Sequence, residues 1–181
     1  MNRISDAEAT LARWHEEAAA VRSRRGGIGV ARPEQVEGLS GVQVFEAMLA
    51  GRLPAPPIGQ TLDFELVQVE PGMAVFQGRP GPAHYNPMGT VHGGWFATLL
   101  DSALGCAVHT TMPVGMAYTT AELGVNIVRA ATTRTGPLRA IGQVLHTGRQ
   151  LATAEARIVG PDGRLYAHAT TTCLVFPLPA G

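Results

Sequence analysis

The sequence predicts an α+β fold in which one long apolar helix lies among antiparallel strands. The helix is predicted over residues 93–108, where apolar residues recur at helical spacing. Several stretches with strand patterns lie on either side of it, and short turns such as Gly160-Pro161-Asp162-Gly163 separate neighbouring ones. Strands joined by short turns pair antiparallel, and one long helix in their midst places the chain in the α+β class.

Residues 1–58 are predicted to form a helical extension that ends in a proline-rich connector. Capping-box patterns at Ser5 and Ser40 each precede a helix, and the second helix stops at Gly51. The apolar stripe of the first helix consists of Ala7, Leu11, Trp14, Ala18 and Val21. Residues 53–57 contain too many prolines for a helix or a central strand, so we expect an extended connector.

Residues 59–181 are predicted to form a single domain built from strands and the long helix. The first strand is expected to begin at Thr61, where apolar and polar residues start to alternate, and to end at Pro71-Gly72. Residues 73–78 then return as its hairpin partner. Further strands are predicted over residues 117–129, 138–147, 151–159 and 165–176.

A polar, glycine-rich loop leads into the long helix and ends in His92, Gly93 and Gly94. The first N–H groups of a helix have no helical partner, and the helix dipole adds partial positive charge there. Glycines let a substrate carbonyl approach those N–H groups closely. Asp101, two turns further on, is a lone carboxylate on an apolar helix. Backbone donors and a carboxylate are the groups that acyl transfer to water requires, although a tight turn and a buried polar residue would leave the same pattern.

The pattern Asn-x-x-Gly-x-x-His-Gly-Gly over residues 86–94, with Asp101 eight residues after Gly93, resembles the hotdog-fold acyl-CoA thioesterases of the phenylacetate-pathway type. The resemblance continues through residues 119–130 and covers roughly residues 59–176. It implies a hotdog fold, in which an antiparallel sheet wraps around the long helix. It also implies that two copies join into one continuous sheet and that dimers associate into tetramers.

The same resemblance implies a reaction and the residues that carry it out. The reaction is hydrolysis of an acyl-CoA or aryl-CoA thioester to the free acid and coenzyme A, which enters only as part of the substrate. Asp101 acts either as nucleophile or as base for a water molecule, and the Gly93 N–H polarises the thioester carbonyl. Asn86 bonds the substrate or the attacking water, or else stabilises the loop as an Asx-turn. His92 shapes the loop or contacts the substrate, and Thr120 positions the water.

Gly93 and Asp101 are too far apart on one helix to serve the same thioester. Eight residues of helix span about 12 Å at about 1.5 Å per residue, whereas both groups must reach atoms of one reacting centre. Antiparallel pairing of two such helices across a twofold axis would solve this problem. We therefore expect composite sites, with Asn86, His92 and Gly93 from one subunit and Asp101 and Thr120 from its partner.

Composition and spacing argue against several other classes of protein. Lys plus Arg and Asp plus Glu each number 14, so no basic excess exists to neutralise a nucleic acid. The histidines and the two cysteines show no metal-ligand spacing, so neither a metal nor a separate cofactor is expected. The N-terminal residues resemble neither a signal peptide nor a membrane span, which favours a soluble cytoplasmic protein with no membrane partner.

Two other functions stay open. A hotdog hydratase or dehydratase characteristically sets a His and a separate acid against a hydroxyacyl chain, whereas Asn86 and the glycine pair favour hydrolysis. A non-catalytic acyl-CoA-binding protein would normally carry a DNA-binding segment, and the first 40 residues have too few basic residues for one. The acyl end is expected to be apolar or aromatic and to be surrounded by Met88, Trp95, Phe96, Met112 and Met116.

Overall fold

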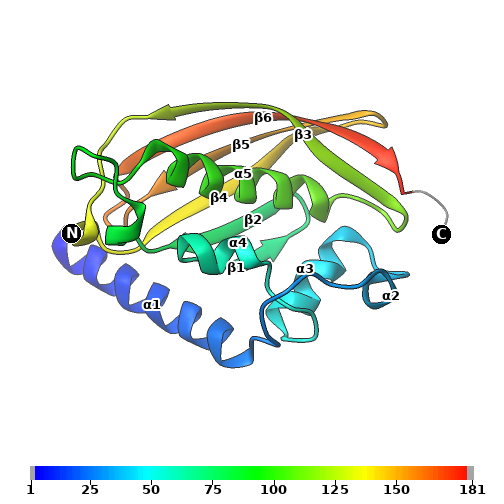
Figure 1. Cartoon of the computed structure of the whole chain (residues 1–181), viewed down its shortest axis with the longest axis horizontal. Helices are drawn as coiled ribbons and strands as arrows, with labels where there is room; N and C mark the ends of the chain where they lie inside the picture. Colours follow the sequence, from blue (N-terminus) through cyan, green and yellow to red (C-terminus); the bar gives the residue numbers. More distant parts are fainter. Residues whose placement is uncertain (1–2, 179–181) are drawn as a thin grey trace.

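A computed structural model describes residues 3–178 and shows one antiparallel sheet wrapped around a long helix (Figure 1). The strands follow the order β1-β2-β4-β5-β6-β3, and every neighbouring pair is antiparallel. They are β1 (Phe64–Glu70), β2 (Met73–Gly78), β3 (Met116–Ile127), β4 (Leu138–Thr147), β5 (Leu151–Val159) and β6 (Leu165–Pro177). The expected hotdog fold is thereby confirmed. The division at residue 58 stays a prediction, and its outermost residues, 1–2 and 179–181, lie outside the described residues.

The long helix α5 (Gly93–Thr110) packs along the sheet and forms the centre of the hydrophobic core. Its side chains at Leu99, Leu100 and Leu104 are fully buried. Gly142 in β4 allows the close approach, because a Cβ there would lie 2.3 Å from the Ala103 carbonyl oxygen. Helix and strand backbones therefore touch directly, which fixes the height of α5 above the sheet.

The helix α1 (Arg3–Arg24) runs along the side of the domain opposite to β3 and β6 in Figure 1. The predicted apolar stripe is confirmed, since Trp14 and Ala18 are buried and the other stripe residues are partly buried. The helix starts earlier than predicted: Arg3 is already helical, so Ser5 lies inside the first turns rather than at the N-cap. Neither Arg3 nor Ile4 opposes helix formation, and the capping-box spacing alone does not end a helix.

Two sets of charged residues attach α1 to the sheet. The buried Glu65 carboxylate of β1 accepts hydrogen bonds from Arg22 and Arg25, the latter at 2.7 Å. The Arg139 guanidinium of β4 lies 4.6 Å above the Trp14 ring and 2.7 Å from the Glu17 carboxylate. A buried charge is stable only when it is paired, so these contacts define where α1 sits.

Three short helices follow: α2 (Pro33–Val36), α3 (Gly41–Leu49) and α4 (Pro57–Leu62). The predicted cap at Ser40 is confirmed in part, since the Ser40 N–H donates to Gln43 Oε1 at 2.8 Å. The predicted start of the first strand is wrong, because β1 begins at Phe64 and not at Thr61. Proline is preorganised for the first position of a helix, so Pro57 starts α4, and the Thr61 hydroxyl donates to the Pro57 carbonyl at 3.2 Å.

Two single-turn 3₁₀ helices, η1 (Pro82–His84) and η2 (Thr133–Thr135), complete the fold. Within residues 3–178, no helix is both long enough and apolar enough to cross a membrane.

Candidate active site

The loop before α5 is closed by the side chain of Asn86. Its Oδ1 accepts hydrogen bonds from the N–H groups of Met88 (2.9 Å) and Thr90 (3.3 Å), and its Nδ2 donates to Thr90 Oγ1 (2.9 Å). Gly89 takes the left-handed conformation, with φ at 78°, which completes the turn. Of the two roles predicted for Asn86, stabilisation of the loop is the one visible within a single chain.

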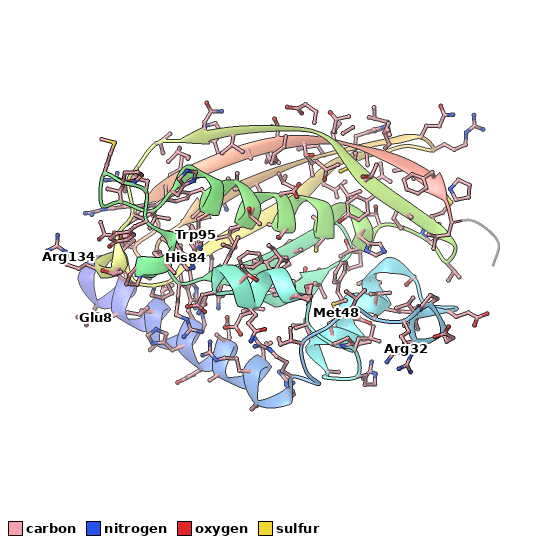
Figure 2. All side chains as sticks on the ribbon, in the orientation of Figure 1. Glu8, Arg32, Met48, His84, Trp95 and Arg134 are labelled. Atoms are coloured by element: carbon pink, nitrogen blue, oxygen red, sulfur yellow. The ribbon has the colours of Figure 1, made fainter. Side chains whose placement is uncertain are left out.

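His92 is the N-cap residue of α5. Its Nδ1 accepts a hydrogen bond from the Gly94 N–H at 2.8 Å, so the ring proton of a neutral His92 is on Nε2. The His92 N–H in turn donates to the His84 carbonyl at 2.8 Å. Figure 2 shows His84 beside Trp95, and the two rings stack with centroids 5.9 Å apart. These contacts support the expectation that His92 shapes the loop.

The Gly93 N–H is the donor that this arrangement leaves open. The His92 ring accepts its hydrogen bond from the N–H of Gly94 and not from that of Gly93. The Gly93 N–H has no hydrogen-bond partner among residues 3–178. A Cβ at Gly93 would lie 3.2 Å from Ile127 Cδ1, so the end of β3 passes close by. An unpaired N–H at a helix N-terminus is suited to bind a carbonyl oxygen that gains negative charge.

Asp101 and Thr120 lie together, two turns further along α5. The Thr120 hydroxyl donates to Asp101 Oδ1 at 3.1 Å, and the Asp101 side chain is partly buried. Thr119, its neighbour on β3, is exposed. The pairing of Asp101 with Thr120 therefore brings a carboxylate and a hydroxyl, expected from the resemblance to act together, within hydrogen-bond distance.

The groups next to Asp101 favour the carboxylate over a thiol or a phenol as the reactive group. Burial, with a smaller contribution from the Asp101 charge, raises the pKa of the Cys106 thiol to about 12. Burial also raises the pKa of Tyr118. Both groups stay protonated near neutral pH, so neither supplies an anionic nucleophile. The Tyr118 ring packs directly on Gly105, where a Cβ would lie 2.6 Å from Tyr118 Oη.

An apolar cavity of about 300 Å³ lies beside the C-terminal half of α5, where Cys106, His109 and Tyr118 form part of its wall. The sequence-based prediction of the acyl end does not match this cavity, since none of Met88, Trp95, Phe96, Met112 and Met116 lines it. Trp95, Phe96 and Met112 are buried in the core, and Met88 is 89% exposed on the loop. Helical spacing turns Trp95 and Phe96 toward the sheet, which sequence inspection did not resolve.

The residues predicted from the sequence thus form two groups at different positions along α5. Asn86, His92 and Gly93 gather at its N-terminal end, and Asp101 and Thr120 meet at its middle. Sequence reasoning gave no role to Cys106, His109 and Tyr118, which line the cavity together with Phe45 and Met48 of α3. Apolar residues at helical spacing over residues 44–49 were the available signal that this face of α3 is covered. Among residues 3–178, no three His, Cys, Asp or Glu side chains gather closely enough to hold a metal ion.

Comparison with known proteins points to one superfamily. Residues 88–167 match the thioesterase superfamily. One similar protein is a phenylacetic acid degradation-related protein from Ralstonia eutropha, provisionally described as a thioesterase. Its sequence is 30% identical to this chain, and its crystal structure matches with a TM-score of 0.65. That match covers 72% of this chain and 98% of the other.

Two further relatives agree with this match. A protein of the phenylacetic acid degradation operon of E. coli is 21% identical over 66% of this chain and 84% of its own, with a TM-score of 0.61, and shows the fold alone. A Halobacterium salinarum protein, provisionally named an esterase, is 37% identical over 82 residues, which make up 45% of this chain. The match spans 54% of that curated relative, about half of its length.

Proposed function

The chain belongs to the thioesterase superfamily, and we propose that it hydrolyses an acyl-CoA or aryl-CoA thioester to the free acid and coenzyme A. The observation that carries this proposal is the pair of groups on α5: an unpaired N–H at Gly93 and a carboxylate at Asp101 bonded to the Thr120 hydroxyl. The first suits an oxyanion, and the second suits a base or a nucleophile.

The chemistry follows one of two routes that consume one water. As a base, Asp101 takes a proton from water while the oxygen bonds to the carbonyl carbon. The C–S bond then breaks, and the leaving thiolate receives that proton. As a nucleophile, Asp101 displaces the thiolate to form an anhydride, which water then hydrolyses. On either route the Gly93 N–H and the helix dipole stabilise the oxyanion, so we propose a metal-independent reaction.

We further propose that each site is shared between two copies of the chain. β3 is an edge strand of 12 residues with one charged side chain, Glu122. A long, weakly charged edge is a template for pairing with another strand. Edge-to-edge pairing of two copies across a twofold axis would run their α5 helices antiparallel. Gly93 of one copy would then approach Asp101 of the other, and two such dimers would form the proposed tetramer.

Thiol release from a panel of acyl-CoA and aryl-CoA thioesters tests the reaction. We expect turnover that a chelator leaves unchanged. Loss of activity with chelator and recovery with zinc would contradict the metal-independent scheme. Binding of these thioesters without any thiol release would instead indicate a non-catalytic acyl-CoA-binding protein.

Mixed dimers test the shared site. An Asp101→Asn chain and a chain carrying both Asn86→Ala and Gly93→Pro should each be nearly inactive. Refolded together, they should regain activity, because a mixed dimer contains one site with every group intact. Mixed dimers that form but stay inactive would show that each subunit works alone.

A further inference from the structure

The cavity beside α5 has a second wall, which comes from the N-terminal extension. Val21 of α1, Ile28, and Phe45, Met48 and Leu49 of α3 line this side. The opposite wall comes from Phe64, Leu66 and Phe76 of β1 and β2, together with Cys106 and Tyr118. The residues of the extension precede the stretch that matches the superfamily, residues 88–167. The extension therefore supplies one whole side of the cavity.

The extension is held in place by specific contacts, so the cavity is built in advance of any ligand. The Gly29 N–H donates to the Ala55 carbonyl and the Ala55 N–H donates to the Gly27 carbonyl, both at 2.9 Å. Gly26 and Gly51 also touch closely, since a Cβ at Gly26 would lie 2.1 Å from the Gly51 carbonyl oxygen. These contacts join the end of α1 to the connector, and the ion pairs of Glu65 join α1 to β1.

The cavity also adjoins the candidate carboxylate. Tyr118 lines the cavity and packs on Gly105, one turn of α5 after Asp101. Thr120, which bonds Asp101, lies two residues after Tyr118 on β3 and so on the same face of the strand. The Asp101 charge contributes to the raised pKa values of both Cys106 and Tyr118, which agrees with this closeness.

We propose that this cavity holds the acyl group of the thioester, and that the N-terminal extension thereby selects which acyl groups are hydrolysed. The inference rests on the proposed thioesterase function. The walls are largely apolar, and the charged groups on them, Arg25 and Glu65, already pair with each other. An uncharged, apolar acyl group is therefore the class that fits.

The volume sets an upper limit on the acyl group. A cavity of roughly 150 Å³ binds benzene, so the 300 Å³ here would hold, by simple proportion, an apolar group of up to about twelve carbons. Medium-chain and aryl acyl groups meet this limit. An acetyl group would leave the cavity empty and gain nothing from it.

Filling the cavity from α3 tests the proposal. Figure 2 labels Met48, which lines the cavity, whereas Glu46 on the same helix is exposed. In Met48→Trp, kcat/KM for decanoyl-CoA relative to acetyl-CoA should fall at least tenfold, while Glu46→Trp should keep the wild-type ratio. Ile28→Trp, at the partly exposed rim, should act like Met48→Trp and serves if that variant does not fold. An unchanged ratio in the folded cavity variants would overturn the inference.

A binding measurement separates this inference from the proposed function. Decanoic acid should raise the melting temperature of the wild type and of Glu46→Trp but not that of Met48→Trp or Ile28→Trp. No rise in the wild type, or an equal rise in every variant, would overturn the acyl pocket whatever the catalytic result. Absence of thiol release from every thioester, together with the expected binding pattern, would overturn only the hydrolysis.

Discussion

The N-terminal end of α5 presents backbone donors beside an exposed loop, whereas the middle of the helix sets a carboxylate next to a cavity. At the N-terminal end, Asn86 and His92 satisfy polar groups a few residues away, and the Gly93 N–H is left open. At the middle of the helix, Asp101 bonds Thr120 of β3, and the neighbouring cavity walls are largely apolar.

The difference shows how the chemistry is divided along one helix. Oxyanion stabilisation needs donors that face a carbonyl, and a helix N-terminus supplies them from its own backbone. A reactive carboxylate and an acyl group need a partly enclosed place, which only packing against distant segments creates. The N-terminal end of α5 thus supplies the donor that its middle lacks, and the middle supplies the carboxylate, which is why we propose that two copies complete each site.

Asp101→Asn, which removes the carboxylate, should lower turnover more than any other change. Asparagine keeps the size of the side chain and still accepts the Thr120 bond, but it neither attacks nor takes a proton. We expect kcat to fall at least about 10²-fold, with the melting temperature nearly unchanged. Ser102→Ala is the control, since the Ser102 hydroxyl bonds the Thr98 carbonyl within the helix at 2.8 Å. Turnover near normal in Asp101→Asn would remove the carboxylate from the mechanism.

Gly93→Pro tests the donor at the N-terminal end of α5. Gly93 is the first residue of α5, where proline fits, and His92 has φ −63° and ψ 142°, the conformation favoured before proline. Loss of the N–H should lower kcat about 10²-fold. Gly93→Ala adds a Cβ near Ile127 but retains the N–H, so it should be much less affected. Equal losses in the two variants would point to crowding by the Cβ.

Thr120→Val should have a smaller effect, because it removes a hydroxyl that acts through Asp101 or water. We expect about a tenfold loss of kcat, equivalent to about 1.4 kcal/mol. Thr120→Ser keeps the hydroxyl that bonds Asp101 and should stay near wild-type activity. If Thr120→Val keeps near wild-type turnover, the hydroxyl is dispensable and the water-positioning role fails.

The smallest expected effect concerns stability in acid and His109, the partly buried histidine in the C-terminal half of α5. Burial lowers the pKa of His109, so below the unfolded value of about 6.5 the unfolded chain takes a proton that the folded chain refuses. The free energy of unfolding should therefore fall as the pH drops below about 6.5, by at most about 1.4 kcal/mol per pH unit.

Urea unfolding of His109→Phe at pH 7 and pH 5.5 measures this contribution. The variant should lose less stability between the two pH values than the wild type does. His146→Phe, at an exposed position, should behave like the wild type. An equal loss in His109→Phe would assign the acid sensitivity to other groups.

The features that the sequence determined by itself are local ones. The apolar period of α5, the cap at Ser40, the turns between strands and the loop of Asn86 all depend on residues a few positions apart. Helical hydrogen bonds and turn geometry are short-range, so the residue order is enough to predict them. The family resemblance then indicated how these pieces are arranged in the hotdog fold.

Only the tertiary structure decided the features that join distant segments. Asp101 meets Thr120 across a helix and a strand. Glu65 is buried, against the alternation of β1, because Arg22 of α1 and Arg25 just after it pair with its carboxylate. The cavity likewise depends on how far α3 stands from α5 and on which side chains leave the gap unfilled. Such volumes result from the simultaneous packing of many side chains, and no local pattern of residues encodes them.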